Sequence, residues 1–275
     1  MVERSKRGKG KHKRGKKLLG SHARCWIWGR NLVRETLLAR RWPFVELYLA
    51  DDLPVDQLEE ARGAATGRGV NVRVEKQEFL EQLGHTTEHQ GFLAKMGPFP
   101  YTPIDDVLSA APEKPVYLVL DSVQDPYNFG AMLRSAGAFA ADAVFIGKHR
   151  QVPVTSMVAR SSAGVVNRVP IVQVADLAEL AQSLRKRNIR VIGASEKADA
   201  SLTDCDFSEA TAIVIGNEGT GIGPELLKCC DGLARIPIAG SVGSLNAAAA
   251  AAGFFFELRR QRGNSQTTYT LHGVK

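Results

Sequence analysis

From residue 114 onward, short apolar runs alternate with longer segments of helical periodicity. The apolar runs, with one longer extended segment, occupy residues 116–120, 143–146, 165–174, 189–193, 212–215 and 233–238. The helical segments occupy residues 128–141, 177–187, 224–230 and 245–261. A strand that is apolar along its whole length must be buried on both faces, and helices supply that cover in a parallel sheet. The pattern therefore predicts an α/β domain over residues 114–262, built on a parallel sheet.

A smaller α/β domain is predicted in front of this sheet, over residues 23–98. Helical spacing indicates helices at residues 26–40, 58–66 and 77–83, and strands are expected at residues 45–49, 70–74 and 91–96. Proline and glycine are frequent just after this domain and periodic apolar residues are few, so residues 99–113 are predicted to be a linker. Residues 263–275 are polar and are predicted to form a flexible C-terminus.

The net charge of +7 is concentrated at one end of the chain. Residues 1–17 hold nine Lys or Arg and one Glu, whereas the other 258 residues hold 27 basic and 28 acidic side chains. A segment so rich in charge and glycine cannot form a core, and residues 1–22 are predicted to be a disordered basic tail. Such a tail attracts RNA or DNA phosphates independently of sequence. A solvated, dispensable extension is the alternative interpretation.

Several classes of protein are disfavoured by what the sequence lacks. No run of 18 apolar residues and no apolar secretion signal occur, which predicts a cytoplasmic protein without a membrane segment. The four cysteines have no C-x-x-C spacing and are expected to be reduced thiols. His85 and His89 are four residues apart, but Gly84 and two threonines interrupt any helix pattern there, so no metal site is predicted.

Three short polar segments follow apolar runs at the points where strands are expected to end. They are residues 128–131 together with Arg134, residues 216–219, and residues 244–246. Open α/β sheets bind ligands outside the carboxyl ends of their strands, so these segments form the candidate site. Each also has a plainer interpretation. Asn128, Ser244 and Asn246 suit helix caps, and the glycines after residue 215 suit a simple turn.

Two nucleotide-binding motifs are absent, and one arginine stands out. The glycines of residues 216–223 do not form G-x-G-x-x-G, and no G-x-x-x-x-G-K-[ST] occurs, which disfavours a nicotinamide-dependent oxidoreductase and a P-loop protein. Arg134 is predicted to lie two turns inside an apolar helix, where a guanidinium is costly unless it is paired. We therefore expect it to contact a carboxylate, such as that of Glu218, or a ligand phosphate.

The order and spacing of these segments resemble a known family. N-x-G-x-x-x-R from Asn128, G-x-E-G-x-G from Gly216, and I-P-x-x-G-x-x-x-S-L-N from Ile236 are similar to the motifs of SpoU (TrmH-type) RNA 2′-O-ribose methyltransferases. Residues 162–164 resemble a further family element. In the front domain, residues 28–31 and 89–91 resemble the L30e-like RNA-binding domain of the subgroup that methylates a guanosine in 23S rRNA.

The resemblance implies methyl transfer from S-adenosylmethionine to a ribose 2′-hydroxyl, in a SPOUT-type domain that contains a trefoil knot and forms a homodimer. The alanine run after residue 246 departs from relatives that carry Val and Ser there, and is consistent with a dimer face. The implied cofactor-binding residues are Ala194, Ser195, Ile215, Gly216, Asn217, Ile236, Ile238, Leu245 and Asn246. The implied catalytic residues are Asn128, Arg134, Glu218, Ser244 and Asn246.

Two questions remain open within this resemblance. Arg134 is expected either to clamp the target phosphate and stabilise the developing alkoxide, or to act as a base, which sits awkwardly with a side chain that stays protonated in proteins. The substrate is expected to be rRNA, because simpler tRNA-methylating relatives tend to lack the L30e-like domain. A tRNA substrate and a non-catalytic RNA-binding protein of this fold are the alternatives.

Overall fold

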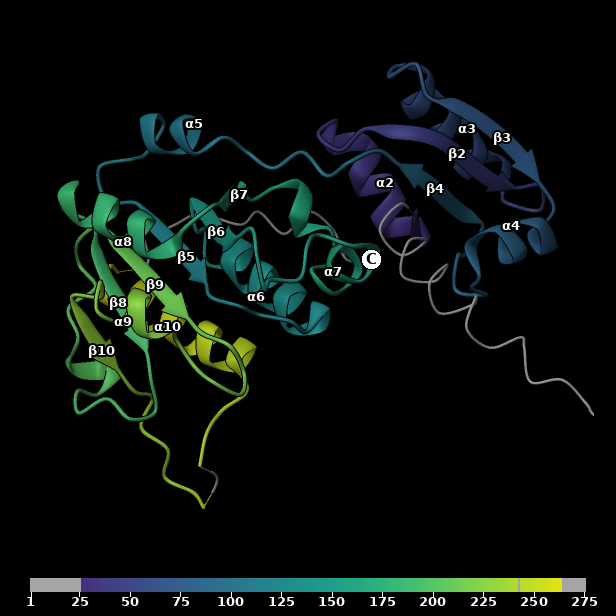
Figure 1. Cartoon of the computed structure of the whole chain (residues 1–275). Coiled ribbons are helices and arrows are strands. Elements are labelled where there is room, and N and C mark those ends of the chain that lie inside the picture. Colours follow the sequence, from purple (N-terminus) through teal and green to yellow (C-terminus); the bar gives the residue numbers. More distant parts are fainter. Residues whose placement is uncertain (1–25, 242, 264–275) are drawn as a thin grey trace, which may run out of the picture. The chain divides into compact units, whose positions relative to one another are not determined.

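The computed structural model describes residues 26–241 and 243–263, and the chain divides into two compact units between Phe99 and Pro100 (Figure 1). The predicted tail of residues 1–22 and residues 264–275 of the predicted flexible C-terminus lie outside the described residues. Along the part of the chain that is described, no helix is long and apolar enough to cross a membrane.

The first unit contains a mixed sheet with the strand order β1-β4-β2-β3. β2 runs parallel to β3, and β4 is antiparallel to both β1 and β2. The strands are β1 (Trp26–Trp28), β2 (Phe44–Ala50), β3 (Asn71–Glu75) and β4 (Phe92–Met96). The helices are α2 (Arg30–Ala39), α3 (Val55–Thr66) and α4 (Gln77–Gly84). This arrangement confirms the predicted small α/β unit.

The single helix predicted over residues 26–40 is wrong at its beginning. Residues 26–28 form β1, which pairs with Leu93–Lys95 of β4, and α2 begins only at Arg30. The break falls at Gly29, whose φ of 93° lies in a region that favours glycine. Three apolar residues in a row suit either a strand or a helix, and sheet pairing decides between them.

The second unit is built on a parallel sheet with the order β10-β8-β9-β5-β6-β7, as Figure 1 shows. Its strands are β5 (Val116–Leu120), β6 (Ala143–Gly147), β7 (Ile171–Val174), β8 (Arg190–Ala194), β9 (Thr211–Ile215) and β10 (Gly232–Ala234). Its helices are α5 (Ile104–Ser109), α6 (Pro126–Ala138), α7 (Ser156–Ser161), α8 (Leu177–Lys186), α9 (Pro224–Leu227) and α10 (Ala247–Gln261). Two short 3-10 helices, Val165–Asn167 and Leu202–Asp204, complete it. The predicted parallel α/β sheet is confirmed.

Two segments of this unit differ from the sequence expectation. The predicted linker of residues 99–113 contains α5, whose Val107 is buried in the core beside Ile104 and Leu108. The segment predicted to be extended from 165 to 174 begins with a 3-10 helix, and only Ile171–Val174 is a strand. Both segments are short, and tertiary contacts outweigh weak local periodicity at such lengths.

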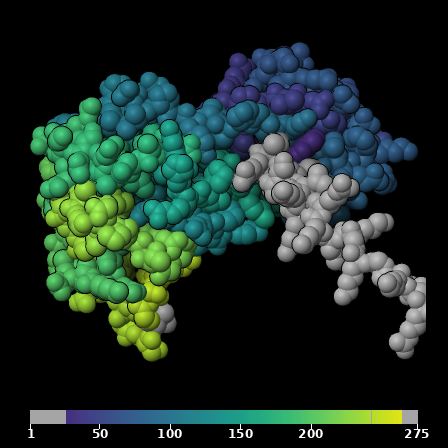
Figure 2. All heavy atoms as spheres, in the orientation of Figure 1, coloured from purple at the N-terminus to yellow at the C-terminus, as the bar shows by residue number. Residues whose placement is uncertain are grey.

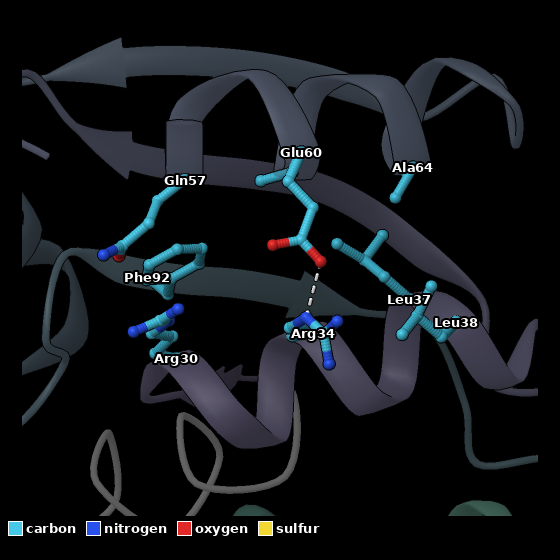
Figure 3. Close-up of a pocket in the computed structure, with 9 residues that line it drawn as sticks. Arg30, Arg34, Leu37, Leu38, Gln57, Glu60, Ala64 and Phe92 are labelled. Atoms are coloured by element: carbon cyan, nitrogen blue, oxygen red, sulfur yellow. Dashed lines mark hydrogen bonds and ion pairs between the residues drawn. The ribbon is translucent and has the colours of Figure 1, made fainter. Parts of the chain in front are cut away.

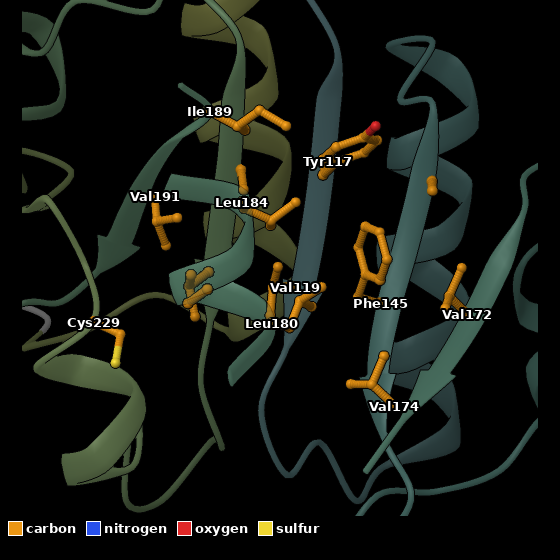
Figure 4. Close-up of a cluster of buried hydrophobic side chains, with 14 of the residues drawn as sticks. Tyr117, Val119, Phe145, Val172, Val174, Leu180, Leu184, Ile189, Val191 and Cys229 are labelled. Carbon is orange, nitrogen blue, oxygen red and sulfur yellow. The ribbon is translucent and has the colours of Figure 1, made fainter. Parts of the chain in front are cut away.

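The core of the second unit lies between the sheet and its helices. On one face, Tyr117 of β5 and Phe145 of β6 meet edge to face at 5.2 Å, and Leu180 and Leu184 of α8 cover them (Figure 4). Elsewhere α6 and α10 pack together, with Phe139 and Phe255 stacked 6.0 Å apart. Strands β5, β6 and β9 are thus buried along their whole length, as continuous apolar runs require.

Candidate active site

A cavity of about 660 Å³ opens at the carboxyl ends of β8, β9 and β10. Carboxyl ends of parallel strands share one edge of the sheet, which is where such folds bind ligands. After β10 the backbone of Arg235 still pairs with Ala200 and Leu202, and the chain that follows, up to residue 241, extends from the surface of the second unit (Figure 1, Figure 2). Predicted site residues among the lining are Ala194, Ser195, Ile215, Gly216, Asn217, Glu218, Ile236, Ile238, Ser244, Leu245 and Asn246.

The cavity also has lining residues that sequence reasoning missed. Glu196 and Lys197 directly follow the predicted Ala194 and Ser195. They could have been predicted if the two residues after Ser195 had been included with that strand end. Arg235 precedes the predicted Ile236 in the same way. Phe254 comes from the third turn of α10, and no sequence signal distinguishes it from ordinary core.

A tight turn after β9 forms one wall of this cavity. Asn217 and Gly221 exchange two backbone hydrogen bonds of 3.0 and 2.9 Å. The Asn217 side-chain oxygen accepts from the N–H groups of Gly219 and Thr220 at 2.9 and 3.1 Å. A Cβ at Gly216 would lie 2.2 Å from the carbonyl carbon of Gly221, so the turn itself requires glycine at position 216.

The loop after β5, residues 121–125, is tied to this turn. The Asp121 carboxylate accepts a hydrogen bond of 2.7 Å from the N–H of Gly223, and Asn217 Nδ2 donates to the carbonyl of Ser122 at 2.8 Å. Asp125, at the end of the loop, caps α6 by accepting from the N–H of Tyr127. The carboxyl ends of β5 and β9 are therefore linked through side chains of both loops.

Hydrogen bonds join the three polar segments that the sequence singled out. Asn128 Nδ2 donates to Glu218 Oε1 at 2.9 Å, and Asn246 Nδ2 donates to Asn128 Oδ1 at 2.9 Å. Asn246 also caps α10, because its Oδ1 accepts from the N–H groups of Ala248 and Ala249. The capping interpretation is thus correct for Asn246, whereas α6 is capped by Asp125 and not by Asn128.

Arg134 lies apart from this network. Its side chain is exposed on α6, and it is not among the residues that line the cavity. Within the described residues it forms no hydrogen bond or ion pair, and Glu218 instead accepts from Asn128. Of the two partners expected for Arg134, the Glu218 carboxylate is therefore not in contact with it, and a ligand phosphate stays a prediction. Exposure to water removes the desolvation cost on which that expectation rested.

The segment that follows β10 offers unpaired backbone groups to a ligand. Among the described residues, the backbones of Ile236, Ile238 and Leu245 form no hydrogen bonds. The side chains of Ile238 and Leu245 are 38% and 44% exposed and border the cavity. Apolar walls, free N–H and C=O groups and charges of both signs suit a ligand with a flat apolar group and charged ends.

Two thiols of the second unit, Cys205 and Cys230, are not poised as nucleophiles. Burial raises the pKa of Cys230 to about 11, and its thiol donates to the carbonyl of Leu226. Burial also raises the pKa of Cys205. A thiol reacts as the thiolate, so these side chains are structural. No cluster of His, Cys, Asp or Glu suited to hold a metal occurs within residues 26–241 and 243–263.

In the first unit, the residues singled out by sequence stabilise a turn before β4. His89 is buried, and its Nδ1 accepts from the N–H of Gly91 at 3.0 Å. Gln90 Oε1 accepts from the N–H of Arg30 at 3.1 Å and so satisfies the first turn of α2. The pocket between α2 and α3 has a volume of about 20 Å³ and is bordered by the Arg34–Glu60 ion pair (Figure 3). It is too small for more than a water molecule.

Fold and site together define an α/β ligand-binding protein whose cavity lies at the carboxyl ends of parallel strands. Comparison with known families makes this specific. Residues 115–256 match the SpoU rRNA Methylase family, and residues 26–102 match the family described as RNA 2′-O ribose methyltransferase substrate binding. The chain belongs to the SpoU family of RNA 2′-O-ribose methyltransferases, as the sequence motifs predicted.

Named relatives and solved structures agree with this assignment. The chain is 34% identical over 240 residues to the putative TrmH family tRNA/rRNA methyltransferase YacO of Bacillus subtilis, covering 86% of this chain and 96% of that protein. It is 33% identical, with the same coverage, to the 23S rRNA (guanosine-2′-O-)-methyltransferase RlmB of Xanthomonas campestris. The AdoMet-bound rRNA methyltransferase of Sinorhizobium meliloti superposes with a TM-score of 0.75 at 25% identity, covering 89% and 90% of the two chains.

Proposed function

We propose that this protein transfers a methyl group from S-adenosylmethionine to the ribose 2′-hydroxyl of a guanosine in 23S rRNA. The observation that carries the proposal is the hydrogen-bonded junction of Asn128, Glu218 and Asn246 at the cavity. Similar proteins support the assignment of the substrate and of the cofactor. The RlmB relative is named for 23S rRNA guanosine, and two similar solved structures, from Sinorhizobium meliloti and Streptomyces viridochromogenes, are described with AdoMet bound.

The cavity residues fit this cofactor. Ile236, Ile238 and Leu245 offer apolar surface for an adenine ring and unpaired backbone groups for its polar edge. Glu196 and Lys197 offer charges of both signs for an amino acid end. When bound, S-adenosylmethionine supplies an electrophilic methyl group on a sulfonium. The turn held by Asn217 keeps this wall in place.

The junction beside the cavity would orient the ribose hydroxyl. Glu218 Oε1 accepts from Asn128. Among the described residues, the one hydrogen bond to Oε2 is a long contact of 3.5 Å from Asn217, which leaves Oε2 able to accept from a hydroxyl. Asn246 holds Asn128 from the other side, and Ser244 lines the cavity next to it. Loss of the hydroxyl proton is what turns a ribose oxygen into a competent nucleophile.

Arg134 is assigned to charge stabilisation. A guanidinium stays protonated in proteins and binds phosphate bidentately. Its exposure on α6, without a partner among the described residues, leaves it available to an RNA phosphate and the developing alkoxide. In the single chain Arg134 lies outside the cavity lining. Its contact with the reacting atoms is therefore assigned to the complex with RNA or with a second copy of the chain.

The proposal extends to the organisation of the chain. Residues 23–98 are assigned to RNA binding, residues 99–113 connect them to the catalytic residues 114–262, and the basic residues 1–22 raise affinity for RNA. A homodimer is proposed through α10, where Phe256 is 61% exposed on a helix that begins with six alanines. Sedimentation of the purified protein tests this; a monomer at micromolar concentration would rule it out.

Mapping of 2′-O-methyl groups on rRNA and tRNA, with and without the protein, tests the activity and the substrate. One new methyl group on a 23S rRNA guanosine is expected. Methylation of tRNA alone would favour the tRNA enzyme, which the name of the YacO relative also allows.

A second measurement tests the assigned roles. Arg134→Ala is expected to lower turnover strongly while cofactor binding is retained, and Arg187→Ala, an exposed arginine at the end of α8, is its control. Wild-type turnover of Arg134→Ala would contradict both roles considered for this side chain.

A further inference from the structure

The loop that follows β6 carries a basic cluster that the proposed chemistry does not use. Lys148, His149 and Arg150 are consecutive and exposed. None of the three side chains has a hydrogen bond or ion pair within the described residues. Exposed Lys and Arg side chains commonly pair with carboxylates beside them. Because these three side chains have no such partner among the described residues, they are available to an external anion.

This basic loop is held firmly beside the candidate site. Gln151 Oε1 accepts from the N–H of Val123 at 2.9 Å, and the N–H of Val152 donates to the carbonyl of Val123 at 2.9 Å. Val123 lies five residues before Asn128, in the loop after β5. At the other end, the N–H of Lys148 donates to the carbonyl of Val174 at 2.9 Å. The loop is therefore fixed at both ends of its basic run.

The order of the strands sets what lies on each side of Asn128. The sheet runs β8-β9-β5-β6, and all these strands are parallel, so the loops at their carboxyl ends stand in that order along one edge. The cavity occupies the β8 and β9 side. Asn128 follows β5, and the basic loop follows β6 on the side away from the cavity.

Carboxylates near this edge do not neutralise the basic loop. Asp121 accepts from the N–H of Gly223 and from the Ser122 hydroxyl, and Asp125 accepts from the N–H of Tyr127. Neither forms an ion pair with Lys148 or Arg150. The positive charge of this loop consequently faces water next to the site where a ribose is expected.

We infer that the basic loop of Lys148, His149 and Arg150 binds backbone phosphates of the RNA strand that flanks the target nucleotide. This inference rests on the proposed function and assigns the path of the substrate. With the cofactor on the β8 and β9 side, the strand that carries the reacting ribose passes over β5 and leaves across β6. Phosphate contacts position a nucleic acid without reading its sequence, which suits a lysine and an arginine on a fixed loop.

The test compares two variants that remove the same number of charges. Lys148→Ala/Arg150→Asn changes the basic loop, and asparagine is chosen because Arg150 has a φ of 54°, which Asn tolerates. Lys186→Ala/Arg187→Ala is the matched control. These exposed residues end α8 and precede β8, so they lie at the amino ends of the strands, opposite the carboxyl ends that carry the basic loop. Affinity for a 23S rRNA fragment is measured at about 50 and 200 mM salt, together with KM for RNA, kcat and S-adenosylmethionine affinity.

Loss of two phosphate contacts lowers the slope of log affinity against log salt by about 1.4–1.8. Raising the salt fourfold lowers the RNA affinity of both proteins. The factor by which it falls is expected to be roughly 7 to 12 times smaller for the loop variant than for wild type. The loop variant's KM for RNA should rise and its S-adenosylmethionine affinity should not change. The control variant should keep the wild-type slope.

Outcomes that overturn the inference are distinct from failure of the proposed function. A loop variant with the wild-type salt slope and KM overturns the inference, as does an equal change in the control. Absence of methylation by wild type on any rRNA or tRNA tested contradicts the proposed function instead. If the double variant unfolds at a lower temperature than wild type, two single variants test the inference instead. Arg150→Lys keeps the charge and is expected to keep the wild-type salt slope. Lys148→Gln removes one charge and is expected to lower that slope.

Discussion

Gly216 lies where β9 ends and the cavity wall begins, and replacing it with alanine is expected to weaken S-adenosylmethionine binding. The added Cβ would stand 2.2 Å from the carbonyl carbon of Gly221 and 2.3 Å from the amide nitrogen of Ile222. Both are backbone atoms, so no change of rotamer relieves the overlap. The two segments must separate by about 1 Å or more to reach ordinary contact.

The magnitude follows from what that separation breaks. Asn217 and Gly221 exchange backbone hydrogen bonds of 3.0 and 2.9 Å across this gap. Each such bond contributes about 0.5–1.5 kcal/mol net, so opening the turn costs about 1–3 kcal/mol. If binding must restore the closed turn, that cost appears in the dissociation constant as a weakening of roughly 5- to 150-fold.

Isothermal titration with S-adenosylmethionine measures the effect, and Gly219→Ala provides the control in the same turn. Among the described residues, a Cβ at Gly219 would meet the Asn217 side-chain oxygen alone, at an ordinary 3.6 Å. Its affinity is expected to stay close to that of wild type. The reasoning is refuted if Gly216→Ala binds as tightly as wild type, or if Gly219→Ala loses as much affinity.

Two further sites give predictions of different kinds. Asn246→Ala removes the cap of α10 and should lower stability by about 0.5–2 kcal/mol in urea unfolding. Asn246→Asp keeps the capping oxygen but loses the donor to Asn128, so it should unfold like wild type and methylate RNA more slowly; an unchanged rate would contradict the role of that bond. Burial lowers the pKa of His89, so the stability from its neutral form is present above the unfolded-state pKa of about 6.5 and is lost as pH falls through the lower folded-state pKa. The urea midpoint of wild type should therefore fall more than that of His89→Gln between about pH 7.5 and 5.5, and parallel profiles would contradict this.

The sheet of the second unit was predictable because its strands carry their own signal. β5 and β6 are apolar at every position and β9 at every position after Thr211, and all three are buried on both faces, so the sequence did not have to show which face is buried. β1 and α5 were missed for the opposite reason. Each is short, and its form depends on a partner: β1 pairs with β4, and α5 places Val107 in a core built from distant strands.

Two implied features of the family stay predictions. The trefoil knot requires the chain to thread a loop, which no local pattern encodes and which ordinary folds avoid. The homodimer depends on a second copy, and the exposed Phe256 and the alanine run of α10 are the features that favour it.

By itself, the sequence determined which residue types stand at the ends of which strands, and through their order and spacing it determined the family. Tertiary structure decided which of them meet. Asn128 reaches Glu218 across 90 residues and Asn246 across 118, because parallel strands bring distant carboxyl ends to one edge. Arg134 is only six residues from Asn128, yet six residues turn a helix to a face about 120° away. Proximity in the chain therefore did not place Arg134 in the cavity, whereas the sheet joined residues that are far apart in sequence.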